Sequence, residues 1–273
     1  MTGKKRGCSG VAAALAVLAT AAPATAQDGW DVEIDTERGI TVASVIYEGG
    51  VGIAVQCSDD DLDFVVLGVP APDESEISDY GHRVLDTGTS ADSLVTSSWK
   101  AVAGSPGATS VYPDRFARSL KGAEAYIVRI PASEGRAPRR MAIPLPSDSS
   151  GIDHVLTACG RRTEDPRDSL PMADAFLLPG WEIGGFDYSG GRPTRESRIL
   201  YSCILTAQGG VRDCQIDFER PADGGLGARL VARQGRARYE YDGPAEALDG
   251  RIIYMPQGFV RPVIVVERVE FLR

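Results

Sequence analysis

The sequence lacks the patterns that usually accompany metal or hydrolytic chemistry. Its 273 residues contain two histidines, His82 and His154, and no Cys-x-x-Cys pair. Zinc sites use closely spaced cysteines and histidines, and thioredoxin-type centres use Cys-x-x-Cys, so both classes are disfavoured. The Gly-x-Ser-x-Gly elbow of many serine hydrolases is also absent. The sequence therefore identifies no catalytic residue, no metal site and no cofactor.

Positive charge is scarce, and no basic cluster is interleaved with aromatic residues. The formal charge is −9 for the whole chain, and it becomes −12 when the three cations of residues 1–26 (Lys4, Lys5 and Arg6) are removed. Such an acidic surface repels nucleic acid, and we expect no nucleic-acid partner.

Long apolar runs are absent apart from one stretch near the N-terminus. Residues 11–22 are apolar, a basic segment precedes them, and residues 24–26 are small. This order is typical of a secretory signal peptide over residues 1–26, with Gln27 as the first mature residue. A retained membrane anchor is the alternative, but the stretch is shorter than the roughly 20 residues of a spanning helix. We expect cleavage, a periplasmic location and no anchor afterwards.

Four cysteines remain once the signal, with Cys8, has gone: Cys57, Cys159, Cys203 and Cys214. An even number in an exported chain predicts two disulfides, although four cysteines allow three connectivities.

The stretch around the last two cysteines narrows this choice. Two β-type runs flank a turn centred between Gln208 and Gly209, which places Cys203 opposite Cys214 in an antiparallel pair. A two-residue loop makes this a hydrogen-bonded pair, and a four-residue loop makes it a non-hydrogen-bonded pair. Either spacing accommodates a disulfide, which leaves Cys57 to pair with Cys159.

Short β-type runs separated by turn residues dominate the first part of the mature chain. Three of them, at 40–47, 51–57 and 62–69, predict an antiparallel meander. Further strands are predicted at 83–86, 93–102, 125–131 and 140–144.

Two short helices are predicted among these strands. The first begins after Tyr112 with Pro113, places Phe116 and Leu120 on one face and ends at Gly122. The second follows Ser149-Ser150 and carries an apolar stripe of Ile152, Val155, Leu156 and Cys159. His154 lies off this stripe, and we expect it to be exposed.

An acidic cluster at residues 59–63 raises the question of calcium binding. Asp59, Asp60, Asp61 and Asp63 lack the Asp-x-Asp-x-Asp-Gly spacing and the distal glutamate of an EF-hand loop. We interpret the cluster as a solvated hairpin turn.

Together these patterns predict an α+β fold with antiparallel sheets and short helices in two small domains. Residues 27–160 form the first domain, which the long-range disulfide closes. The polar, proline-containing residues 161–179 are predicted to be a linker, and residues 180–273 the second domain.

The second domain contains the motifs Tyr201-Ser-Cys203-Ile-Leu-Thr-Ala-Gln-Gly209, Val211-Arg-Asp-Cys214-Gln-Ile216 and Glu219-Arg-Pro221. A small-residue helical stretch at 227–233 and a β-type ending at 251–259 follow. Residues 195–259 thus resemble the C-terminal domain of TonB-type energy transducers, in the cysteine-bearing form of some proteobacteria. The resemblance implies the order strand, glycine turn, strand, short helix and final strand pair. The N-terminal half has no such resemblance.

The chain departs from this family at two points. TonB-type domains usually open with a Tyr-Pro-x-x-Ala-like helix, where this sequence has Trp181-Glu-Ile-Gly-Gly-Phe-Asp-Tyr188. Anchored transducers also carry an uncleaved N-terminal helix and a proline-rich spacer. Without an anchor, work from an inner-membrane motor is not expected to reach the domain. The resemblance then implies a module whose sheet edge binds a peptide by strand addition.

The sequence therefore predicts an exported, periplasmic, non-enzymatic protein with a TonB-like interaction domain. Its expected partner is an envelope or outer-membrane protein bound through a sheet edge, with an accessory role in receptor or transport systems. Two alternatives remain open. One is a structural envelope protein without a receptor partner. The other is an exported hydrolase with a carboxylate site, involving residues such as Glu134 or Asp174, that sequence spacing does not reveal.

Export and oxidation can be tested together on protein isolated from the periplasm. We expect an N-terminus at Gln27 and an intact mass lower than the fully reduced mass by two hydrogen atoms for each of two disulfides. Peptide mapping should join Cys203 to Cys214. Free thiols, or a link between Cys57 and Cys203, would contradict the pairing.

Overall fold

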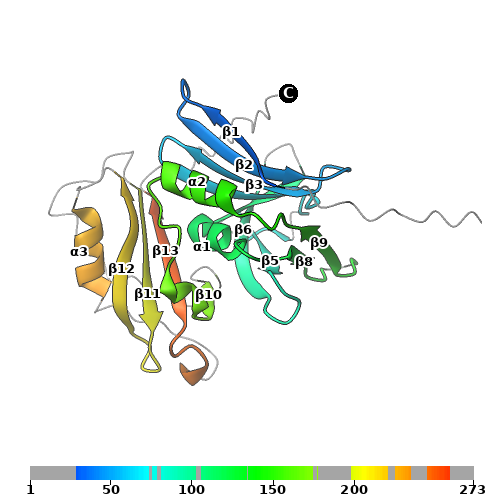
Figure 1. Ribbon diagram of the computed structural model, residues 1–273. Coiled ribbons are helices and arrows are strands. Elements are labelled where there is room, and N and C mark those ends of the chain that lie inside the picture. The colour runs from blue at the N-terminus through cyan, green and yellow to red at the C-terminus, as the bar shows by residue number, and fades with distance from the viewer. Residues whose placement is uncertain are drawn as a thin grey trace, which may run out of the picture.

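The computed structural model places two β-sheets side by side, with helices packed on their faces (Figure 1). It describes residues 29–73, 76–78, 81–102, 106–133, 135–174, 177, 198–220, 225–234 and 245–258. The predicted signal peptide, Glu134, and the segment from Trp181 to Tyr188 lie outside these residues. Within the described part of the chain, no helix is long and apolar enough to cross a membrane.

The first sheet begins with an antiparallel meander of consecutive strands. These are β1 (Asp31–Asp35), β2 (Ile40–Ile46), β3 (Gly52–Ser58) and β4 (Asp61–Leu67). The last three match the runs predicted at 40–47, 51–57 and 62–69. The acidic residues form the turn between β3 and β4, where Asp59 and Asp60 have positive φ angles. Among the described residues, no group of three or more metal-binding side chains is present.

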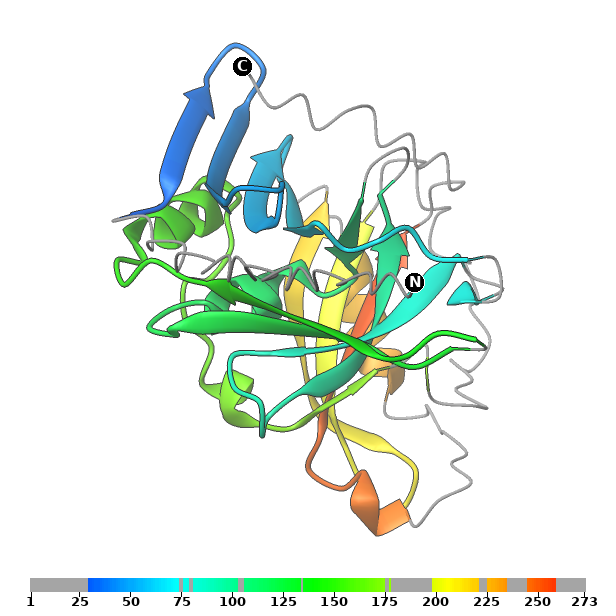
Figure 2. The same ribbon diagram turned by 90° about the vertical axis from the view of Figure 1, so that its right-hand side faces the viewer.

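Five more strands complete this sheet, in the order β1-β2-β3-β4-β7-β6-β5-β8-β9. They are β5 (His82–Gly88), β6 (Val95–Ala101), β7 (Gly107–Ser110), β8 (Ala125–Ile130) and β9 (Arg139–Pro144). The sheet curls strongly, which brings the Tyr47 hydroxyl, just after β2, within 2.9 Å of the Pro144 carbonyl of β9, to which it donates. Figure 2 shows these strands curving in front of the second sheet.

Two helices pack on the first sheet and fill its core. Helix α1 (Pro113–Ser119) begins with proline in its first turn, and Gly122 follows it with a φ of 70°. Helix α2 (Ser150–Ala158) buries Ile152, Val155 and Leu156, while His154 is exposed. The disulfide between Cys57 and Cys159 connects the end of α2 to β3, across a sequence separation of 102 residues.

The second sheet has the order β10-β13-β11-β12. Its strands are β10 (Met172–Asp174), β11 (Arg198–Leu205), β12 (Val211–Arg220) and β13 (Ile252–Gly258). Helix α3 (Leu226–Gln234) covers the face opposite the first sheet (Figure 1). Helix and sheet approach closely at Gly227, where a Cβ atom would lie 2.8 Å from the Ile216 side chain. Short 3-10 helices, η2 (Pro166–Ser169) and η3 (Ala245–Ala247), precede β10 and β13.

The hairpin of β11 and β12 carries the second disulfide, between Cys203 and Cys214, but its register differs from a regular ladder. Leu205 pairs with Val211 around a five-residue loop at 206–210, and a bulge follows at Asp213, whose φ is 49°. The bulge adds one residue to β12, so the two cysteines still face each other, with 4.0 Å between their Cα atoms. The loop is therefore longer than either predicted alternative.

One apolar core extends across both sheets. Met172, Leu200, Ile252 and Tyr254 of the second sheet are buried in the same cluster as Phe64, Trp99 and Phe116 of the first part of the chain. A separate cluster between the second sheet and α3 includes Tyr201, Leu230 and the Cys203–Cys214 disulfide.

The segment predicted to be a linker, residues 161–179, contains regular structure. Within that span, η2 and β10 are regular elements, and Met172–Asp174 pairs in parallel with Ile252–Tyr254. Met172 and Ala173 are apolar and buried, so this part of the span packs with the second sheet. The predicted α+β class with antiparallel sheets and short helices agrees with the structure. Strands β1, β7 and β10 were not predicted.

The two disulfides should contribute unequally to stability. In the chain-entropy model, the loop closed by Cys57–Cys159 contributes about 4 to 5 kcal/mol, and the short loop closed by Cys203–Cys214 about 3 kcal/mol. We expect the double variant Cys57→Ala/Cys159→Ala to lose more unfolding free energy in urea than Cys203→Ala/Cys214→Ala. Equal losses of unfolding free energy, or a larger loss in Cys203→Ala/Cys214→Ala, would contradict this ranking of the two disulfides.

Candidate functional site

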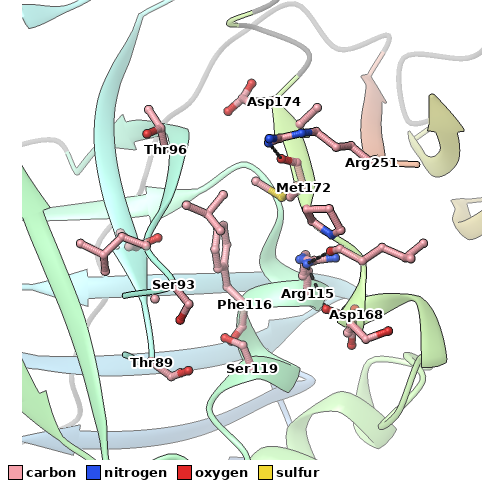
Figure 3. Close-up of a pocket in the computed structure, with 18 of the residues that line it drawn as sticks. Thr89, Ser93, Thr96, Arg115, Phe116, Ser119, Asp168, Met172, Asp174 and Arg251 are labelled. Carbon is pink, nitrogen blue, oxygen red and sulfur yellow. Dashed lines mark hydrogen bonds between the residues drawn. The ribbon is translucent and has the colours of Figure 1, made fainter. Parts of the chain in front are cut away.

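A cleft of about 700 Å³ lies where the two sheets meet (Figure 3). One side is the hairpin of β5 and β6, which contributes the hydroxyls of Thr89, Ser93 and Thr96. The other side is formed by η2, β10 and the turn before β13, and α1 contributes Phe116 and Ser119. This volume lies within the range of sites that bind small molecules or short peptides.

Two guanidinium groups, those of Arg115 and Arg251, line the cleft on the side opposite the β5–β6 hairpin (Figure 3). Arg115 donates to the carbonyl oxygens of Asp168 and Leu170, at 3.0 and 2.7 Å, and lies beside the Tyr254 ring. Arg251 donates to the carbonyl oxygens of Ala247 and Met172, at 2.8 and 3.4 Å. In the described part of the chain, neither arginine has a carboxylate within ion-pair distance.

The two acids that line the cleft have partners of their own. Arg118 binds the Asp168 carboxylate through two hydrogen bonds of 2.6 and 2.9 Å. Burial alone would lower the pKa of Arg118, but the bonds to Asp168 raise it above its ordinary value. The cation is therefore permanent, and Asp168 is neutralised by Arg118 rather than by Arg115.

Asp174 is almost fully buried at the other end of the cleft. Its carboxylate accepts hydrogen bonds from the Ser98 backbone N–H at 2.5 Å and from the Tyr112 hydroxyl at 2.8 Å. The Ser98 bond joins β10 of the second sheet to β6 of the first, and the Tyr112 bond joins β10 to the start of α1. The pKa of the nearby His82 is lowered by burial and by Lys100, although Asp174 opposes this shift.

A buried charged network joins α1, β12 and the turn between β3 and β4. The guanidinium of Arg161 lies 3.3 Å from Asp114 and 3.4 Å from the centre of the Phe218 ring, and it donates to the Asp60 carbonyl. Burial raises the pKa of Asp114, and Arg161 and Arg118 oppose that shift.

Asp217 of β12 belongs to the same network. It accepts a 2.5 Å hydrogen bond from the Ser202 hydroxyl and lies 3.6 Å from Arg162. Its side chain is only 8% exposed, and burial raises its pKa more than these partners lower it.

The sequence-predicted site residues were the four cysteines, and they lie away from the cleft. Cys57 and Cys159 belong to the main core, and Cys203 and Cys214 to the cluster under α3. Sequence reasoning missed Arg115 and Arg251, because residues 136 positions apart in the chain carry no spacing signal. Asp174, which the hydrolase alternative named, does line the cleft, whereas Glu134 lies outside the described residues.

Among the described residues, each sheet ends in strands that are paired on one side only. β1 is regular, with five consecutive pairs to β2 from Asp31↔Ser44 to Asp35↔Ile40. Its Ile34 is 56% exposed and its Val32 is 40% exposed. β12 at the edge of the second sheet has two register shifts, and the Ile216 carbonyl accepts a bond from Arg162.

Comparisons of the chain with protein-family models, with curated proteins and with solved structures found no match.

The raised pKa of Asp217 predicts how its contribution to stability depends on pH. Its ordinary value is 3.8, and the folded protein binds the proton more tightly than the unfolded chain. Rising pH therefore removes stability from pH 3.8 up to the folded pKa. We expect the unfolding free energy of the wild type, relative to Asp217→Asn, to fall as pH rises through this window.

Asp148 provides a control of opposite sign for these urea titrations. Hydrogen bonds from the Ser150 backbone and hydroxyl lower its pKa below 3.8. The wild type should therefore lose stability relative to Asp148→Asn as pH falls below this value. A difference between wild type and Asp217→Asn that is constant with pH would show that burial does not shift Asp217.

Proposed function

We propose that this protein is exported to the periplasm and acts as a non-enzymatic interaction protein that binds an envelope or outer-membrane protein by strand addition. The basic, apolar and small-residue pattern of residues 1–26 supports export. Two disulfides in the folded chain agree with an oxidising compartment.

The edge position of β1, which pairs only with β2 among the described strands, is the observation that carries the proposal. An edge strand presents unpaired N–H and C=O groups, and proteins usually protect such edges with bulges, charges or covering segments. β12 is bulged at two points, and Arg162 already occupies one of its carbonyls. β10 is three residues long. β1 is regular and exposes apolar side chains, so it is the edge best suited to accept another strand.

The side chains of β1 also indicate the character of the partner. Asp31 and Glu33 are exposed and alternate with Val32 and Ile34. Asp35 is used within the chain, because its carboxylate accepts the N–H groups of Glu37 and Arg38. An extended segment that alternates basic and apolar residues would match both the charge and the apolar contacts of this edge.

The TonB-like resemblance stays part of the proposal as an expectation for the second sheet. Its described elements follow the order strand, glycine turn, strand, helix and strand. In this proposal the first sheet provides the contact with the partner, and the second sheet supports it. An accessory role in a receptor or transport system follows if the partner is an outer-membrane protein.

Photocrosslinking in the periplasm tests the proposal and distinguishes the two edges. A photoreactive amino acid in place of Glu33 should give a discrete crosslinked product, whereas the same group in place of Arg212 on β12 should not. Ile34→Lys should weaken the Glu33 crosslink about tenfold or more, because a buried isoleucine contributes about 1.5 to 3 kcal/mol. Ile77→Lys, at an exposed isoleucine outside β1, is the matched control.

Each other outcome has a defined meaning. A product from position 212 alone would move the interaction to the second sheet. No product from either position, above the level of a reporter that lacks the crosslinker, would favour the structural envelope protein.

A further inference from the structure

The cleft between the sheets has an unusual distribution of charge. Its two acids are engaged, Asp168 by Arg118 and Asp174 by Ser98 and Tyr112. Its two arginines are held by backbone carbonyl oxygens alone, apart from the 3.4 Å contact between Arg115 and the Tyr254 hydroxyl. A carbonyl oxygen positions a guanidinium but does not cancel its charge. Two positive charges therefore lack an anionic partner among the described residues.

The guanidinium groups are also fixed before any ligand arrives. Arg115 uses two carbonyls and the face of Tyr254, and Arg251 spans from the η3 turn to β10. Because their geometry is already set, binding would require little further ordering of these long side chains. A guanidinium has five N–H donors, so after these bonds each arginine keeps N–H groups that can donate to a carboxylate.

The remaining lining of the cleft restricts the ligand further. Phe116, Leu170 and Met172 provide apolar surface beside the arginines, and Thr89 and Ser93 provide hydroxyls on the opposite side. An inorganic anion would leave this apolar surface uncovered. A carboxylate attached to an apolar body would pair with the arginines and also cover the apolar lining.

We propose that the inter-sheet cleft binds an organic carboxylate, with Arg251 and Arg115 holding the carboxylate and the Phe116–Met172 wall holding its apolar body. Two sources share this chemistry: a free carboxylic acid and the C-terminal carboxylate of a peptide. This site is separate from the β1 edge, and its occupation does not depend on strand addition.

Calorimetric titration of the mature, oxidised protein tests the proposal with matched pairs of probes. 4-Phenylbutyrate and its amide represent a free acid, and acetyl-Ala-Phe with a free or amidated C-terminus represents a peptide. We expect at least one acid to bind with a Kd of about 1 mM or tighter, and its amide to bind about tenfold or more weakly. Whichever acid binds more tightly identifies the source.

Variants locate the binding in the cleft. Arg251→Gln should weaken the better acid about tenfold or more, because it removes a charge-assisted contact. Arg140→Gln on β9, an exposed arginine that does not line the cleft, should leave the affinity unchanged. Ser93→Asp adds a negative charge at the exposed rim without changing either arginine, and it should also weaken binding.

The proposal is overturned if acid and amide bind equally, if Arg251→Gln and Ser93→Asp both bind like the wild type, or if neither acid binds. Equal binding of sulfate and the organic acids would reduce the cleft to a general anion site and would also contradict it. Circular dichroism of each variant checks that it remains folded. Crosslinking at Glu33 is measured separately, so failure at one site leaves the result at the other intact.

Discussion

The arrangement of the two sheets depends on the contacts that the buried guanidinium of Arg161 makes. It reaches the turn between β3 and β4 through the Asp60 carbonyl, α1 through Asp114, and the second sheet through the ring of Phe218. A buried arginine needs such partners, because an unpaired charge away from water is strongly unfavourable. The turn, the helix and β12 are therefore held in one relative position, and the walls of the cleft are held with them.

The junction combines this charged layer with an apolar one. Tyr112 and Tyr254 pack with their ring centres 6.0 Å apart, and the Tyr112 hydroxyl continues to Asp174. Apolar burial supplies the larger part of such an association, whereas hydrogen-bonded charges mainly fix its geometry. A cleft between two packed sheets needs both, since it stays open only if the surfaces beside it are held apart at a defined spacing.

Local patterns predicted the elements well, and long-range contacts were beyond their reach. Pro113 and the stripe from Ile152 to Cys159 predicted both helices of the first part. Turn residues, which are glycines at 49–50 and acids at 59–61, predicted the meander, and a glycine turn predicted the β11–β12 hairpin. β1 was not predicted, because its five residues include only two apolar ones, Val32 and Ile34, between acids. β10 was not predicted, because three residues are too few to show a periodic pattern. The cleft could not be predicted, since Arg115 and Arg251 line the same cavity only after β13 enters the second sheet between β10 and β11.

The central position of β13 has a consequence for the order in which the chain assembles. β13 lies between β10 and β11, yet it is made after both of them and after α3. The hairpin closed by Cys203–Cys214 can form before the rest of the second sheet, because its pairing is local. The inner edge of β11 and the whole of β10 must wait for residues 252–258. Completion of the second sheet is therefore tied to synthesis of almost the entire chain, and a truncation before Ile252 would leave a stapled hairpin with no sheet to join.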